Sequence, residues 1–164
     1  MFFFMQPELK TMRQKHLIGM YFSGPFQLLG VEMPKLWEKY MPRIEEIPGV
    51  IAPSVQYGVS DENFEHRMYT EFLAVEVEAF TAIPVGMVGF TLPSTEYAVF
   101  THQGPMSTVP ATYQAVFGWL AQNGYAQDTS VLRFERYDER YNPTLHEKER
   151  AENAYEIWVP IRKG

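Results

Sequence analysis

The sequence predicts an α+β fold, because a strand-helix-strand-strand pattern occurs twice along the chain. When the chain is laid on itself with a shift of 80 residues, similar features coincide in the same order. The coinciding segments are Tyr21–Phe26 with Thr101–Met106, Leu36-Trp37 with Val116-Phe117, and Tyr57 with Tyr137. The two segments of the first pair both contain a Gly-Pro turn signal. Three such coincidences in order indicate a duplication.

Each half is predicted to begin with a strand that stops at its Gly-Pro pair, over residues 16–22 and 96–102. The helix of the first half is expected to start at Pro34, because proline is favoured in the first helical turn. Pro42 is expected to break or kink this helix, and a short second turn follows.

The helix of the second half is predicted to begin near Pro110, with Ser107 or Thr108 as its cap. The pair Asn123-Gly124 is a stop signal for this helix. Between these limits, apolar side chains recur at helical spacing, at Tyr113, Val116, Phe117 and Leu120.

Two extended segments are predicted after each helix. They cover residues 51–60, 68–77, 131–137 and 154–161, a further strand near 87–92 joins the halves, and a polar loop covers 138–153. No low-complexity linker interrupts the chain. We therefore expect one domain over residues 1–164, with modules at about 7–80 and 84–164.

The composition favours a cytoplasmic protein with a cationic partner. The formal charge is -6 and the Lys and Arg residues are dispersed, which argues against binding of nucleic acid or of a membrane surface. The absence of Cys excludes disulfides and Cys-ligated metals and suits a reducing compartment. The apolar start at residues 1–5 is too short for a signal peptide, and no apolar run is long enough to span a membrane.

The common motifs of catalysis and metal binding are absent from the sequence. It contains no G-x-G-x-x-G, no Walker-type loop, no G-x-S-x-G and no H-E-x-x-H. The four histidines are far apart along the chain, so we expect no metal, and nothing indicates a cofactor. Because the two halves use almost every residue, no helix-turn-helix unit is expected, and neither is direct DNA binding.

Several short segments together resemble the GyrI-like domains, which are related to the effector-binding domains of AraC-type and MerR-type multidrug-responsive regulators. The segments are 20–26, 34–38, 54–58, 83–87, 97–105, 134–137 and 155–161. Each is weak by itself, but their order and spacing are specific, and they span nearly the whole chain.

The resemblance implies two modules related by a pseudo-twofold axis, an antiparallel sheet with two main helices, and a ligand cleft where the modules meet. In the regulators this domain is attached to a DNA-binding segment. This chain resembles a free-standing member of the family, whose partner is a small hydrophobic or cationic ligand. A protein partner or a homodimer remains open.

Glu135 matches the position at which the resemblance implies a buried carboxylate that faces the ligand. A carboxylate beside aromatic rings attracts a hydrophobic cation by its charge and by the cation–π contacts of the rings. The alternation of the strand by itself favours another interpretation. In that interpretation Phe134 points inward, and Arg133, Glu135 and Tyr137 lie on a solvated face.

Tyr57 lies in the corresponding strand of the first half, and similar domains place an aromatic residue there against the ligand. Tyr137 is its expected repeat equivalent. The alternative for Tyr57 is a place in the core, because Val55 and Val59 share its face of the strand.

The resemblance also nominates residues at the two Gly-Pro turns and at the helix starts that follow them. They are Pro25, Phe26, Leu28 and Met33 in the first half, and Pro105, Met106 and Val109 in the second. Ordinary turn and core packing is the alternative for each of them. Glu156 is either a second acid of the cleft or a partner for Arg133 or Arg136 on the adjacent strand.

Three functions are open on the sequence alone. The first is reversible binding of hydrophobic cations by a sensor or sequestering protein. The second is hydrolysis of reactive, cyclopropane-type toxins, because some GyrI-like proteins have this activity; Glu135 would then be a general acid beside Tyr57 or Tyr137. The third is a protein-interaction module, because relatives include a gyrase inhibitor. The sequence favours binding over catalysis, and no catalytic residue is assigned.

Overall fold

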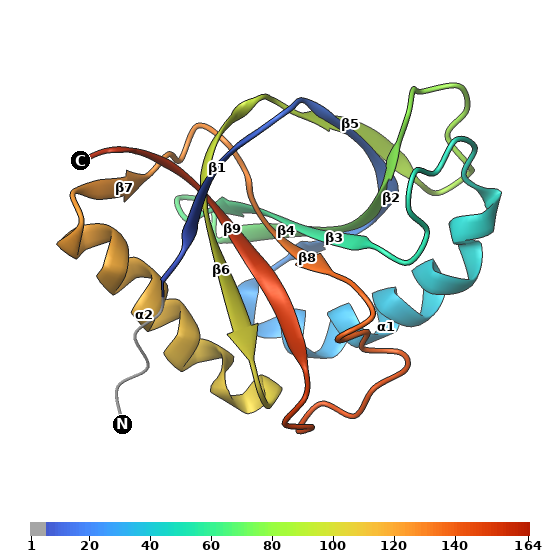
Figure 1. Cartoon of the computed structure of the whole chain (residues 1–164). Coiled ribbons are helices and arrows are strands. Elements are labelled where there is room, and N and C mark those ends of the chain that lie inside the picture. The colour runs from blue at the N-terminus through green and yellow to red at the C-terminus, as the bar shows by residue number, and fades with distance from the viewer. Residues whose placement is uncertain (1–5) are drawn as a thin grey trace.

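The computed structural model describes residues 6–164, in which two α-helices and nine β-strands are found (Figure 1). The helices are α1 (Leu29–Tyr40) and α2 (Val109–Gln122). The strands are β1 (Glu8–Met12), β2 (Lys15–Gly24), β3 (Gln56–Asn63), β4 (Met68–Val77), β5 (Val88–Leu92), β6 (Thr95–Gln103), β7 (Tyr125–Gln127), β8 (Arg133–Tyr137) and β9 (Ala154–Lys163). The apolar stretch 1–5, which the sequence predicts not to be a signal peptide, lies outside the described residues. In the described part of the chain, neither helix is long and apolar enough to cross a membrane.

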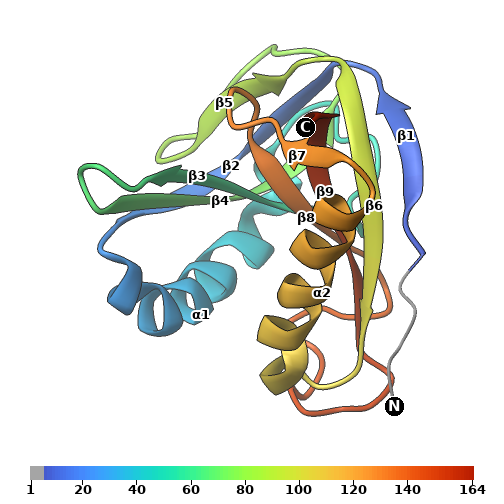
Figure 2. The same ribbon diagram turned by 90° about the vertical axis from the view of Figure 1, so that its left-hand side faces the viewer.

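The strands form an antiparallel sheet in the order β1-β6-β9-β8-β3-β4-β2-β5, and β7 pairs with the end of β9. The central pair, β3 and β8, joins the strands of the first half to those of the second. Figure 2 shows α1 beneath the sheet, where it packs against β2 and β4, and α2 beside β6. The expected antiparallel α+β fold with two main helices is confirmed.

The duplication is visible in the register of the sheet. The first residues of α1 and α2, Leu29 and Val109, are 80 positions apart, as the sequence shift predicts. The edge strands follow the same shift: Val88 of β5 pairs with Gly19 of β2, and Glu8 of β1 pairs with Val99 of β6. Each half therefore adds one edge strand to the sheet of the other half.

The shift of 80 residues does not persist into β3 and β8, contrary to the expectation for Tyr57 and Tyr137. Tyr57 points away from the helices, into a cluster that it shares with Phe134, 77 positions further on. Tyr137 points toward the helices and contacts Trp37 of α1. Counted from the first residue of the helix, the equivalent strand position thus comes three residues earlier in the second half (80 − 77 = 3). An odd difference changes the face of every side chain.

Several boundaries and one helix cap differ from the sequence prediction. Helix α1 begins at Leu29 with Pro34 inside it, because its packed residues stabilise the helix against the loss of one backbone donor. Thr108 does not cap α2 with its side chain, which donates instead to the carbonyl oxygen of Pro105 at 2.7 Å. Strand β3 begins at Gln56, because residues 51–55 form turns around Pro53. Strands β1 and β7 were not predicted.

Two apolar clusters attach the helices to the same side of the sheet. In the cluster under α1, Leu36 and Trp37 of the helix pack with Leu73 and Val75 of the sheet. In the cluster under α2, Val116 and Leu120 of the helix pack with Phe100 and Ile157 of the sheet. A third cluster fills the curl of the sheet on the opposite side, with Leu17, Val59, Tyr97 and Phe134 as members. Because each helix covers the outer strands of its own half, the helix-facing side of β3 and β8 lies between the two covered regions.

Candidate functional site

Polar side chains occupy the helix-facing side of β3 and β8, where the flanking strands carry apolar ones. Gly58 lies opposite Glu135, and Ser60 lies opposite Arg133. In the row through Glu135 the next residues outward are Leu73 and Ile157, both buried. We call the following residues the polar strip: Ser60, Glu62, Glu71, Tyr113, Arg133, Glu135, Tyr137 and Tyr155.

Three tyrosines surround the carboxylate of Glu135. The hydroxyl of Tyr137 donates to Oε1 of Glu135 at 3.2 Å. Burial raises the pKa of Tyr113, Tyr137 and Tyr155, and the negative charge of Glu135 raises each of these pKa values further. The three phenols are therefore neutral hydrogen-bond donors, which come from α2, β8 and β9.

The ring of Tyr137 is held in place from three directions. It meets the ring of Trp37 edge-on at 5.3 Å between centroids and stacks on Tyr155 at 4.8 Å. On the third side lies Gly58, where an added Cβ would be 3.2 Å from the ring of Tyr137. The aromatic wall beside Glu135 thus depends on a residue without a side chain on the neighbouring strand.

Arg133 occupies the other end of the polar strip. Its Nη1 donates to the hydroxyl of Tyr113 at 3.1 Å, and its Nη2 forms an ion pair with Glu62. The guanidinium carbon also lies 5.2 Å from the centroid of the Tyr113 ring. A partly buried positive charge, an aromatic face and a carboxylate therefore meet at this end of the strip.

Glu71 is a further carboxyl of the polar strip. Burial raises its pKa to about 7, the negative charge of Glu135 acts in the same direction, and the hydroxyl of Ser60, which donates to Oε2 at 2.8 Å, lowers it. The charge of the polar strip therefore changes near neutral pH.

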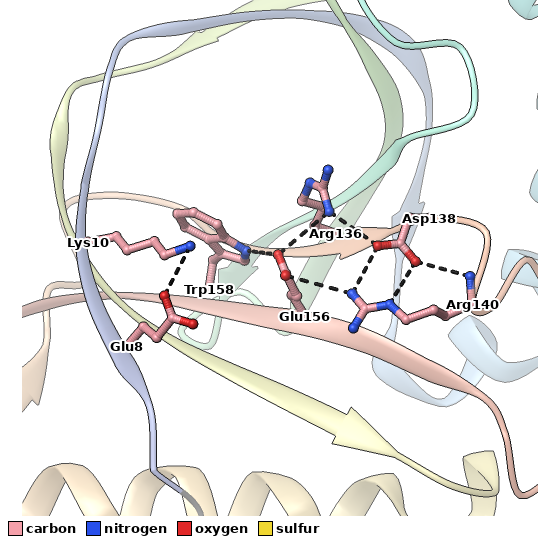
Figure 3. A network of polar contacts seen from close by, with 7 residues as sticks. All are labelled: Glu8, Lys10, Arg136, Asp138, Arg140, Glu156 and Trp158. Carbon is pink, nitrogen blue, oxygen red and sulfur yellow. Dashed lines mark hydrogen bonds and ion pairs between the residues drawn. The ribbon is translucent and has the colours of Figure 1, made fainter.

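Of the predicted site residues, the structure brings Glu135 and Tyr137 together and places Tyr57 and Glu156 on the opposite face of the sheet. Glu156 accepts a hydrogen bond from Nε1 of Trp158 at 3.0 Å and lies 3.8 Å from Nη1 of Arg136; both contacts are drawn in Figure 3. Glu156 thus has Arg136 as a partner, as one of its two alternatives predicts, and contact of Glu156 with a ligand stays untested. We leave Tyr57 and Glu156 out of the proposed site.

The residues nominated at the Gly-Pro turns lie at the starts of the two helices. Pro25, Phe26 and Leu28 are exposed, and Phe26 packs edge-on against Tyr69 at 5.3 Å. Met33 packs against the cluster under α1, while Met106 and Val109 pack against the cluster under α2. The carbonyl oxygen of Pro105 lies 3.3 Å from Nε2 of the buried His102. Contact of these residues with a ligand stays a prediction.

Several members of the polar strip were not predicted from the sequence. The helical spacing of Tyr113 indicates only helix packing, and the alternation around Tyr155 indicates only a strand. Arg133 shares a face with Glu135 because the two are separated by one residue, which is a signal that the sequence contains. Glu71 reaches the site only through the pairing of β4 with β3, which no local pattern reveals.

A pocket of about 280 Å³ lies at the Arg133 end of the polar strip, and its walls include Ser60, Glu62, Arg133 and Phe117. A larger hollow of about 600 Å³ lies at the end of α1, where its walls are mostly apolar and Glu45 is their one ionisable residue. We assign the site to the polar strip, because a specific site requires several converging polar groups rather than volume alone. Within residues 6–164, no group of three His, Asp or Glu side chains is arranged to hold a metal ion.

The fold and the sequence are both similar to those of known proteins. The family model described as the GyrI-like small-molecule-binding domain matches residues 5–162. The transcriptional regulator BrlR of Pseudomonas aeruginosa is 32% identical over 149 residues, which cover 88% of this chain and 51% of that protein. The chain thus spans about half the length of this relative.

Two solved structures share the fold. SAV2435 bound to tetraphenylphosphonium superposes with a TM-score of 0.74 and 17% identity, covering 96% of this chain and 94% of that one. The C-terminal domain of EcmrR superposes with a TM-score of 0.72 and 19% identity, covering 99% of this chain and 100% of that one. The chain belongs to the family of GyrI-like small-molecule-binding domains.

Proposed function

We propose that this chain reversibly binds small hydrophobic cations at the polar strip, as a sensor or a sequestering protein. The observation that carries the proposal is the carboxylate of Glu135 among three neutral tyrosines. Tyrosine rings present a negative face to a cation, and their hydroxyls stabilise the carboxylate while no cation is bound. These groups together provide charge and rings for a cation that carries apolar substituents.

The ion pairs of the strip leave negative charge available for a ligand. Arg133 is paired with Glu62, whereas within residues 6–164 no Lys, Arg or His forms an ion pair with Glu135 or Glu71. A half-buried carboxylate without a cationic partner attracts a positive ligand more strongly than an exposed one does, because water screens it less. The formal charge of -6 on the whole chain acts in the same direction at long range.

The surroundings of the strip suit apolar groups on the ligand. Trp37 contacts Tyr137 at one end, and Phe117 lines the pocket at the other. The binding of tetraphenylphosphonium, a cation with four aromatic groups, by SAV2435 supports a ligand of this class for this chain.

The test is a calorimetric titration of the purified chain with tetraphenylphosphonium. We expect saturable binding of one cation per chain, and Glu135→Gln should weaken it at least about tenfold, because a partly desolvated charge pair is lost. The matched control is Glu156→Gln, which removes the same charge on the opposite face of the sheet. It should retain the affinity of the wild-type protein.

Tetraphenylborate, an anion of the same shape, separates charge recognition from simple hydrophobic binding. We expect no saturable binding of this anion. Equal binding of the two ions, or equal effects of Glu135→Gln and Glu156→Gln, would contradict the proposal.

The two other functions considered from the sequence would be recognised by other measurements on the same variant. Chemical conversion of an electrophilic ligand, lost in Glu135→Gln, would support the hydrolase. A protein partner that is retained by Glu135→Gln, with no binding of any cation, would support the interaction module.

A further inference from the structure

The guanidinium of Arg133 already makes the contacts that the proposed ligand would make. It lies over the ring of Tyr113, donates to the hydroxyl of the same residue and pairs with the carboxylate of Glu62. Its side chain is only 18% exposed, although arginine side chains are usually at the surface.

We propose that Arg133 is an internal cation of the polar strip, which competes with the ligand for the negative charge of the strip and so determines its affinity and selectivity for cations. The inference rests on the proposed function and adds a specificity-determining residue to it. Without a bound ligand, Arg133 balances part of the negative charge of the strip. A bound cation therefore has to share the carboxylates with Arg133.

The charges of the strip support this role. Glu62, Glu71 and Glu135 lie on adjacent strands around one arginine, and the register places Arg133 in the same row as Ser60 and Glu71. Several buried carboxylates close together repel one another, and a positive charge among them reduces this repulsion. The positive charge of Arg133 also lowers the pKa of Glu71, which burial raises.

The position of Arg133 lets it act on a ligand directly. Its side chain lines the pocket of about 280 Å³ together with Glu62, and it hydrogen-bonds to Tyr113, a neighbour of Glu135. A ligand that extends from Glu135 into this pocket contacts the guanidinium. In this pocket a cation therefore binds less favourably than a neutral molecule of the same shape, unless the side chain of Arg133 moves away or is removed by substitution.

The first test compares the affinity for tetraphenylphosphonium of the wild-type chain, Arg133→Gln and Arg136→Gln at low ionic strength. We expect Arg133→Gln to bind about tenfold more tightly, because a like charge a few ångströms from the ligand is removed. Arg136 is on the same strand but faces the opposite side, where it pairs with Asp138 and Glu156 (Figure 3). Arg136→Gln changes the net charge equally and should change the affinity less than about twofold.

A second pair of variants keeps the test decisive if Arg133→Gln folds poorly because Glu62 is left without its partner. Glu62→Gln should weaken cation binding, because the charge of Arg133 is then fully directed at the remaining carboxylates. Glu62→Gln combined with Arg133→Gln removes both charges, and should bind the cation more tightly than Glu62→Gln does. Equal affinities of these two proteins would overturn the inference.

The outcomes distinguish this inference from the proposed function. If the wild-type chain and all variants fail to bind the cation, the proposed function and the inference are both wrong. If the wild-type chain binds it, Glu135→Gln weakens binding and Arg133→Gln does not strengthen it, only the inference is wrong. Arg133 is then a structural partner of Glu62 without influence on the ligand.

Discussion

Gly58 and Tyr137 lie against each other across the central strand pair, so that a Cβ on Gly58 would be 3.2 Å from the aromatic ring. The absence of a side chain on β3 therefore determines where a ring of β8 lies. Because the hydroxyl of this tyrosine donates to Glu135, the glycine also affects the position of the carboxylate.

Gly58→Ala should displace the ring of Tyr137 and weaken both folding and cation binding. We expect a loss of about 1 kcal/mol in the free energy of unfolding, which is typical of adding a methyl group to a packed region. Urea unfolding and the titration with tetraphenylphosphonium measure the two effects. The control is Gly118→Ala in α2, where an added Cβ meets no heavy atom within 4 Å and better helix propensity should stabilise the protein. An unchanged affinity in Gly58→Ala would show that the ring of Tyr137 is not needed in that position.

Tyr137→Phe should keep the aromatic wall but lose the hydrogen bond to Glu135. We expect cation affinity to fall about fivefold, because Glu135 is no longer held in position, and the free energy of unfolding to fall by about 1 kcal/mol or less, the usual range for one hydrogen bond. Tyr57→Phe is the matched control, because Tyr57 lies on the opposite face in the cluster with Phe134. Loss of binding in Tyr57→Phe alone would place the ligand on that opposite face instead.

Stability should fall as the pH rises through neutrality, because the pKa of Glu71 is raised from an ordinary value of 4.5 to about 7 in the folded chain. The folded protein binds this proton more tightly than the unfolded chain does, so the stabilising effect of the protonated carboxyl is present below the lower pKa and is lost as the pH rises through the upper one. Glu71→Gln should remove this dependence and, above pH 7, should be more stable than the wild-type chain by about 2 kcal/mol.

Urea unfolding of both proteins at pH 5 and pH 8 measures this effect. The difference between their free energies of unfolding isolates Glu71, because the other titrating groups contribute equally to both proteins. The exposed Glu65→Gln is the control and should follow the wild-type pH dependence. Parallel pH profiles for Glu71→Gln and the wild-type chain would contradict the raised pKa.

Pro34→Ala should stabilise the chain, because Pro34 lies inside α1, where it cannot donate a backbone hydrogen bond. We expect a gain of about 1 to 2 kcal/mol in the free energy of unfolding, less than the full cost of an interior proline because part of its strain is relaxed. Pro110→Ala in the first turn of α2 is the control, since proline is tolerated there. A loss of stability in Pro34→Ala would mean that its ring packs more favourably than an alanine would.

Local chemistry was sufficient to predict most of the fold. The end of α2 follows from Gly124, which adopts a φ of 77° that other residues avoid, and β4 occupies the predicted residues. The start of α1 was not predictable, because packing of Trp37 and its neighbours outweighs the local preference of Pro34. Strand β7 is only three residues long and depends on its pairing with β9.

The candidate site was less predictable than the fold, because it combines residues that are far apart in the sequence. Glu135 and Tyr137 share one short strand, and their common face follows from strand alternation. Tyr113 and Glu71 join them only when α2 and β4 are placed against the central strands. The difference of three residues between the halves decides which tyrosine faces the helices, and a comparison based on one constant shift misses it.

The pairing of Gly58 with Glu135 also shows that the two halves differ at equivalent positions of the central strand pair. At equivalent places on β3 and β8, one half carries no side chain and the other carries a carboxylate. An acid at this position in both halves would place two like charges opposite each other across the pair of β3 and β8, and their repulsion would be unfavourable. At this pair of positions the first half leaves room and the second half supplies the carboxylate, so a duplicated framework carries one acid at its axis instead of two.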